Sequence, residues 1–212
     1  DKSGLSEDTL VIYTSDHGMS LGEHGFWGHG EDTWPSNTHR EANHIPLIVR
    51  PPCDADGGRV EKRLVGTMDI FATVLDFAGA ARPGTDETAS RSLRRLIEGS
   101  EPDWDEAVFM EQEETRSIRT REWLFMQRFA PTSYDFSHEL FDLTQDPGER
   151  NNIADDPVYQ PVAEALSARI NAYFERYSDP KWNLWKGGTV KSNSSRPFLW
   201  KEVWGKNWEP GF

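Results

Sequence analysis

The sequence has little that would tie the protein to a membrane, a nucleic acid or a disulfide-stabilised fold. Its one cysteine, Cys53, excludes an internal disulfide framework and leaves the cellular compartment open. No apolar run is long enough to span a bilayer, so no membrane partner is expected. Lysine and arginine total 23 against 36 acidic residues, and the net charge of −13 argues against a nucleic-acid partner, because little would neutralise phosphates.

The chain also lacks an initiator methionine and a signal peptide, since it opens on Asp1 and Lys2. This beginning predicts a fragment, or a processed or truncated chain. Its 212 residues suffice for one or two domains with a sizeable core.

The most informative feature that is present lies near the beginning of the chain. Residues 10–14 are apolar and β-branched and read as a buried strand, which Ser15-Asp16-His17-Gly18 follows directly. In open α/β sheets, ligands bind beyond the carboxyl ends of strands. Asp16 and His17 therefore stand where a metal ion or an anionic substrate would be met.

Further elements around this strand predict part of a larger sheet. Residues 45–50 form a second strand pattern, and residues 64–79 read as a helix capped by Thr67 and ended by Gly79. The predicted apolar face of this helix comprises Ile70, Phe71, Val74, Leu75 and Ala78. These strands are too few for a self-standing domain. Residues 1–105 are therefore expected to be the edge of a larger mixed or parallel sheet.

The rest of the chain predicts a small α+β subdomain over residues 106–177 and a tail over 178–212. Four short strand patterns lie at hairpin-like separations, at residues 107–111, 117–119, 123–128 and 139–143. A long helix beginning at Pro157, with Asp156 as its cap, would lie across their antiparallel sheet. The tail carries five tryptophans, which favour packing over the domain, with a sugar-stacking platform as the alternative.

Taken in order, these motifs resemble the C-terminal half of sulfatases, enzymes of the alkaline-phosphatase-like superfamily. The resemblance covers roughly residues 8–177. The motifs that carry it are Thr14-Ser15-Asp16-His17-Gly18, Leu21-Gly22-Glu23-His24-Gly25-Phe26-Trp27-Gly28, Ile45-Pro46-Leu47-Ile48-Val49-Arg50, the helix at 67–79, Ile118-Arg119-Thr120-Arg121-Glu122-Trp123 and residues 139–152. It implies an α/β fold, namely the C-terminal part of an alkaline-phosphatase-like mixed sheet sandwich with a small α+β subdomain.

The resemblance also implies a metal site. In sulfatases an Asp followed by Asn or His at this strand end binds a divalent cation, usually calcium, and Asp16 and His17 match that pair. An imidazole is a less usual calcium ligand, so His17 leaves manganese or zinc open as alternatives.

Two departures from the sulfatase pattern lie in the loop that follows. The lysine that binds sulfate oxygens in the family is replaced by His29 in Gly28-His29-Gly30. His29 is therefore the expected catalytic and sulfate-binding residue, with His24 a weaker catalytic candidate. An insertion at 32–37 adds Trp34 as a candidate substrate contact. Together with His39 and His44, these imidazoles could build a second metal site, line a pocket or lie on the surface.

The nucleophile motif of sulfatases, Cys/Ser-x-Pro/Ala-x-Arg, does not occur around Cys53. The resemblance therefore implies a formylglycine nucleophile in a missing N-terminal half of the same enzyme, and little or no activity of this chain alone. The predicted function is hydrolysis of a sulfuric ester on a small molecule or carbohydrate. Two alternatives are a phosphodiester or phosphonate monoester hydrolase of the same superfamily and a non-catalytic glycan-binding module.

Overall fold

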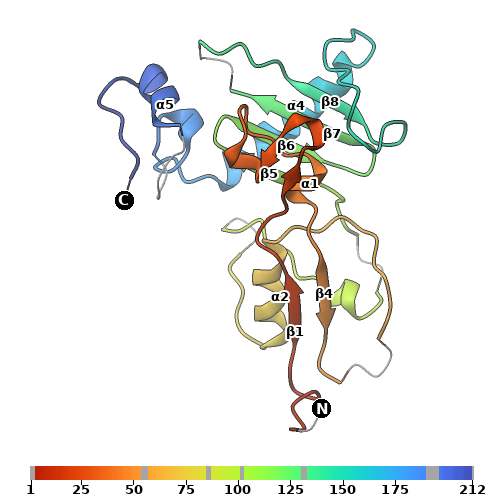
Figure 1. The fold of residues 1–212 in the computed structure, drawn as a ribbon. Helices are drawn as coiled ribbons and strands as arrows, with labels where there is room; N and C mark the ends of the chain where they lie inside the picture. Colours follow the sequence, from red (N-terminus) through yellow and green to blue (C-terminus); the bar gives the residue numbers. More distant parts are fainter. Residues whose placement is uncertain are drawn as a thin grey trace. The chain divides into compact units, whose positions relative to one another are not determined.

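The computed structural model describes residues 3–53, 57–84, 87–100, 103–129, 133–189 and 196–211. The chain divides into two compact units, shown in Figure 1. The first unit comprises residues 1–18 and 44–106, and the second comprises residues 19–43 and 107–212. Among the described helices, none has both the length and the apolar character needed to cross a bilayer.

The first unit is built on a two-stranded ribbon with short helices. β1 (Val11–Thr14) pairs antiparallel with β4 (Leu47–Arg50), so that Tyr13 lies opposite Ile48. Both strands lie within the predicted ranges. The helices of this unit are α2 (Asp69–Phe77) and α3 (Arg94–Ile97).

The helix α2 lies where the sequence predicts it but buries a different face. Phe71 and Val74, expected in the apolar face, are 51% and 44% exposed, whereas Asp69 and Thr73 are 1% exposed. The reason is a set of polar contacts with the segment before α3. Asp69 accepts hydrogen bonds from the backbone N–H groups of Gly66 and Arg91, and Thr73 Oγ1 accepts one from the N–H of Leu93. Ser90 Oγ, rather than Thr67, accepts a hydrogen bond from an N–H group in the first turn of the helix, that of Ala72.

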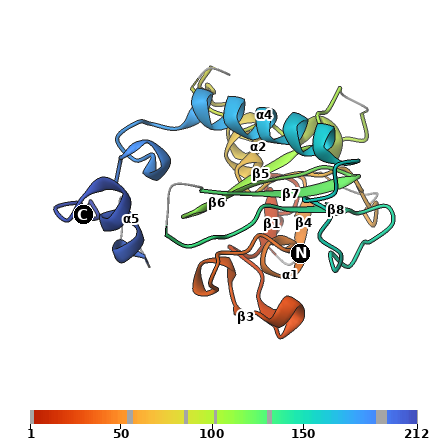
Figure 2. The same ribbon diagram turned by 90° about the horizontal axis from the view of Figure 1, so that it is seen from above.

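The second unit is centred on a four-stranded antiparallel meander in the order β5-β6-β7-β8. The strands are β5 (Val108–Gln112), β6 (Thr115–Arg119), β7 (Trp123–Arg128) and β8 (Glu139–Asp142). The long helix α4 (Gln160–Tyr177) runs across one face, as Figure 2 shows. The unit also contains β2 (Ser20–Leu21), η1 (Glu23–Gly25), β3 (Trp27–Gly28), η2 (Gly30–Asp32), α1 (Arg40–Asn43), η3 (Leu184–Lys186) and α5 (Pro197–Trp204).

The meander is covered on both of its faces. Alternate side chains point to opposite faces of a strand, so Phe125 meets α4 while its neighbours Leu124 and Met126 point the other way. On that second face Phe141 contacts the ring of His39, at 5.5 Å between ring centroids. Residues 19–43 thus form the second cover, and Figure 2 shows them opposite α4. The sequence assigns this segment to a domain spanning 1–105, whereas its contacts join it to the second unit.

The helix α4 begins three residues after the position predicted from Pro157. The Asp156 carboxylate does accept a backbone hydrogen bond, from Val158, but this bond closes a turn that precedes the helix. Pro161 occupies the first turn instead. Leu166, Ile170 and Phe174 form the buried stripe of the helix and pack on the meander.

The tryptophan-rich tail belongs to the second unit and packs against it. Trp200 and Trp208 are buried in a cluster with Phe129, Leu184 and Leu199. The indole N–H of Trp200 donates to the Glu113 carboxylate, and those of Trp185, Trp204 and Trp208 donate to backbone carbonyls. Packing accounts for these rings, as the sequence favours.

Candidate functional site

Asp16 and His17 follow β1 in the first unit, as the sequence predicts. Asp16 Oδ2 lies 3.6 Å from His17 Nε2, and both side chains are open to solvent. His17 Nδ1 lies 2.8 Å from the carbonyl oxygen of Gly18, which accepts its proton. Nδ1 is engaged in this bond, so Nε2 is the ring nitrogen that a cation bound together with Asp16 would contact. The pair therefore fits two ligands of one ion.

The local backbone keeps Asp16 in its charged form. Hydrogen bonds from backbone N–H groups, above all that of His17 at 2.9 Å, hold the pKa of Asp16 below its ordinary value. The carboxylate is therefore ionised at neutral pH, as a ligand for a hard cation must be.

His29 lies in the second unit between two positions that require glycine. Gly28 has φ of +115°, and a Cβ at Gly30 would lie 2.4 Å from the carbonyl oxygen of Asn37. The imidazole between them is half-exposed, and its Nε2 lies 3.0 Å from Asp32 Oδ2. Its reach toward solvent suits a substrate contact, but an anion there would compete with Asp32.

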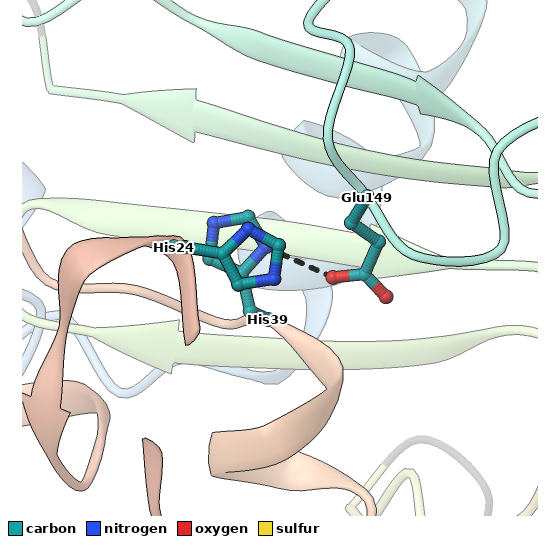
Figure 3. Close-up of side chains that lie close together, drawn as sticks. All are labelled: His24, His39 and Glu149. Carbon is teal, nitrogen blue, oxygen red and sulfur yellow. Dashed lines mark hydrogen bonds and ion pairs between the residues drawn. The ribbon is translucent and has the colours of Figure 1, made fainter. Parts of the chain in front are cut away.

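His24 belongs to a buried cluster with His39 and Glu149, which Figure 3 shows. Its ring stacks on that of His39, with 3.7 Å between centroids and 4° between planes. His39 Nδ1 lies 2.9 Å from Glu149 Oε2. The sequence proposes His24 as a catalytic residue and leaves His39 among several loop histidines. The structure places both in this cluster, whereas His29 pairs with Asp32.

Glu149 is fully buried and has several polar partners. Oε2 also accepts a hydrogen bond from the backbone N–H of Arg40, and Oε1 pairs with the guanidinium of Arg119. Burial acts to raise the pKa of Glu149, but the hydrogen bond from His39 and the charge of Arg119 outweigh it, so this pKa lies below its ordinary value. Glu149 is therefore a carboxylate at neutral pH.

Trp34 is 40% exposed and sits in an aromatic group. The rings of Tyr134 and Phe136 meet it edge-on, at 5.0 and 4.8 Å between centroids. The guanidinium of Arg196 lies over its ring at 5.1 Å. An indole held in this way has an exposed surface that a sugar or another apolar group could cover.

Residue-by-residue interpretation of the sequence misses the roles of three of these groups. Arg119 and Glu149 lie within motifs that carry the sulfatase resemblance, yet nothing in their spacing shows that they pair with each other. The sequence also does not indicate that Glu41 approaches His24, although Glu41 Oε2 lies 3.5 Å from His24 Nε2. An acidic residue close in sequence to a histidine-rich loop is the signal that could have found it.

Comparison with known proteins finds a family match over most of the chain, in residues of both units. The sequence model of a family described as N-sulphoglucosamine sulphohydrolase, C-terminal, matches residues 22–176. An N-acetylglucosamine-6-O-sulfatase of Bacteroides thetaiotaomicron is 28% identical over 186 residues, which cover 84% of this chain and 32% of that protein.

Solved structures agree with this match. A protein in complex with its substrate D-glucosamine-2-N,6-O-disulfate has a TM-score of 0.70 and 27% identity, covering 84% of this chain and 37% of that one. A phosphonate monoester hydrolase of Agrobacterium radiobacter has a TM-score of 0.70 and 25% identity, with the same coverage of 84% and 37%. The chain spans between 29% and 39% of the length of eight curated relatives that it matches.

Proposed function

This chain belongs to the sulfatase family of the alkaline-phosphatase-like superfamily, and from that premise we propose that it contributes the metal-holding wall of an enzyme that hydrolyses sulfuric esters. The chain's part is to bind and orient the ester, while the nucleophile, formylglycine in this family, belongs to a part of the enzyme other than residues 1–212.

The observation that carries the proposal is the geometry of Asp16 and His17. Oδ2 and Nε2 lie 3.6 Å apart, and the hydrogen bond from His17 Nδ1 to the carbonyl oxygen of Gly18 leaves Nε2 as the ring nitrogen on the side of Asp16. A divalent cation held there would draw charge from the non-bridging oxygens of the ester. Calcium is the cation we expect first, and the imidazole keeps manganese and zinc as alternatives.

For the substrate we propose a sulfated carbohydrate or another sulfated small molecule. His29 would donate a hydrogen bond to a sulfate oxygen or assist the leaving group, and Trp34 would contact the rest of the substrate. His24 is the weaker of the two catalytic candidates, because it is the more buried and stacks on His39. The relative solved with a disulfated glucosamine supports this substrate class.

A second candidate is hydrolysis of phosphonate monoesters or phosphodiesters. His17 in place of Asn favours it, and so does the likeness to a phosphonate monoester hydrolase at a TM-score of 0.70. The two candidates share the same metal-holding pair, and their esters all carry a single negative charge, so they differ in the central atom, sulfur or phosphorus, and in its substituents.

The test is hydrolysis of an aryl sulfate, an aryl phosphate diester and an aryl phosphonate by the full-length protein that carries this chain. We expect the sulfate to be hydrolysed fastest, and we expect Asp16→Ala and His17→Ala each to abolish turnover. His44→Asn is the matched control, because His44 is an exposed histidine outside the proposed machinery.

Faster hydrolysis of the phosphonate would move the assignment to the second candidate. Full activity of the Asp16→Ala protein would contradict the proposed metal site. Glycan binding that survives both chelation and the double change at Asp16 and His17, with no hydrolysis, would make the chain a non-catalytic binding module.

A further inference from the structure

The cluster of His24, His39 and Glu149 belongs to the second unit, whereas Asp16 and His17 belong to the first, and it offers the ligands of a transition metal. One ligand atom from each of the three side chains lies within 4.8 Å of the others. Two imidazole nitrogens and one carboxylate oxygen form a ligand set found in zinc sites, where the metal–ligand bonds are about 2.0–2.2 Å long. Calcium, by contrast, takes six to eight oxygen ligands and suits this set poorly.

We propose that His24, His39 and Glu149 bind a zinc-like divalent cation that links the loop of residues 19–43 to the turn that follows β8. His24 lies in η1 and His39 just before α1, on the loop that covers one face of the meander. Glu149 lies in the turn after β8. The ion would thus join segments that are 110 residues apart in the sequence.

Glu41 offers a fourth ligand. Glu41 Oε2 is buried, lies 3.5 Å from His24 Nε2 and has no hydrogen-bond partner among the described residues. A buried carboxylate oxygen without a hydrogen bond costs free energy unless a cation or proton compensates it. Coordination by Glu41 would complete a four-ligand shell.

The surroundings supply the outer partners that metal ligands need. Arg119 pairs with Oε1 of Glu149. Oε2, which lies 2.9 Å from His39 Nδ1, is therefore the oxygen that would bind the ion. Glu139 Oε2 lies 3.8 Å from His39 Nε2 and can accept its proton, so that Nδ1 becomes the ligating nitrogen. Such carboxylate–histidine pairs fix the tautomer and orientation of a ligating imidazole.

Binding requires one rearrangement. The parallel stack of His24 and His39 directs their lone pairs along parallel planes, so one ring has to tilt before both can reach a single ion. His24 is the ring free to do so, since it is the more exposed and lies between Gly22 and Gly25. The ion would replace the hydrogen bond from His39 Nδ1 to Glu149, and a neutral His39 would then carry its proton on Nε2, which faces Glu139.

The experiment titrates Zn²⁺ into the chain carrying Asp16→Ala and His17→Ala, so that the metal site proposed at these two residues cannot account for any Zn²⁺ that binds. Calorimetry measures the affinity for Zn²⁺, and thermal unfolding measures the stabilisation that binding gives. We expect one Zn²⁺ bound, a raised Tm and no comparable binding of Ca²⁺. Adding His24→Asn is expected to weaken Zn²⁺ binding more than the roughly 10–100-fold that loss of an outer partner costs. Asn suits the positive φ of 55° at this position.

His44→Asn in the same protein is the matched control and is expected to leave the Zn²⁺ affinity unchanged. Near-ultraviolet circular dichroism checks the fold of each variant. Should His24→Asn unfold the chain, the half-exposed Glu41→Gln replaces it, and we expect weaker Zn²⁺ binding there too. The proposal is overturned if the chain with Asp16→Ala and His17→Ala does not bind Zn²⁺. It is also overturned if His24→Asn, or Glu41→Gln in its place, leaves the Zn²⁺ affinity unchanged. Neither result bears on sulfate hydrolysis.

Discussion

At the scale of single residues, the second unit keeps several charged groups in its interior, each with a partner of opposite charge. Arg128 pairs with Glu139, Arg196 with Glu114, and Arg119 with Glu149. Removing one member of such a pair leaves a buried charge uncompensated, whereas an intact pair adds little net stability.

For Glu149→Gln we expect the free energy of unfolding to fall by about 3 kcal/mol. The value lies at the lower end of the range for broken buried pairs, because Arg119 is partly exposed and regains some solvation. Urea denaturation of chelator-treated protein measures the loss without a metal contribution. The exposed Glu122→Gln is the control, and equal stability of the two variants would contradict this account.

His138 predicts a pH dependence of stability near neutrality. Partial burial of the ring, and next the charge of Arg128, lower the pKa of His138 below its ordinary value of 6.5. The unfolded chain then binds the proton more readily, so this contribution to stability is complete above pH 6.5 and is lost as the pH falls through and below that value. The effect is small, because the residue is exposed enough for solvent to screen it.

The measurement is the pKa of His138 by NMR, together with urea midpoints at about pH 7 and about pH 5. His138→Asn keeps an acceptor for the N–H of Arg128, which bonds His138 Nδ1 at 3.1 Å, and removes the titration. A folded pKa at or above the ordinary value would show that the sign is wrong.

At the scale of elements, the turn between β5 and β6 holds two other segments in place. Glu113 adopts a φ of 50°, which is unusual for a residue other than glycine. Its Oε2 accepts the indole N–H of Trp200, and Glu114 Oε1 accepts the N–H of Ser36. The turn thereby anchors α5 as well as the loop that carries Trp34.

The packing of α4 on the meander gives a prediction at this scale. Ile170 is fully buried against the strands, whereas Glu164 on the same helix is exposed. Ile170→Ala leaves a cavity and is expected to cost about 2–5 kcal/mol of unfolding free energy. Glu164→Ala is expected to cost less than about 0.5 kcal/mol. Denaturant unfolding of both variants is the measurement, and similar losses would show that α4 does not pack through this stripe.

At the scale of the whole molecule, the net charge of −13 dominates the electrostatics. Like charges repel one another in the compact state, and salt screens that repulsion over a Debye length of about 10 Å at 0.1 M. We therefore expect Tm to rise as sodium chloride is raised from low concentration. Thermal unfolding in chloride and in an uncharged osmolyte separates screening from general cosolvent effects. A Tm that falls with salt would mean that attractive ion pairs outweigh the repulsion.

Much of the fold could be predicted from local patterns. The strands β1, β4 and β5 to β8 and the presence of α2 and α4 follow from apolar runs, alternation and helical spacing, because each pattern involves neighbours along the chain. The exposed Phe71 and Val74 show where this reasoning stops. The buried side of α2 is set by Arg91 and Leu93, whose contacts with the helix no periodicity encodes.

The second cover of the meander illustrates the same limit for the candidate site. The unbroken apolar run Leu124-Phe125-Met126 in β7 is typical of a strand buried on both faces, but it does not say what lies on the second face. The structure supplies the loop of residues 19–43 there, and with it the meeting of His39 and Glu149.

The sequence by itself determined the family and the order of the longer strands and helices. It also determined that Asp16 and His17 lie together, since adjacent residues at a strand end share one place in any fold. Only the tertiary structure decided which distant side chains meet. His24 and His39 stack, and Glu149 joins them, because burial of the meander's second face brings their segments together. Hydrophobic burial is non-directional, so the sequence shows that such a face must be covered, while shape and polar pairing decide by what.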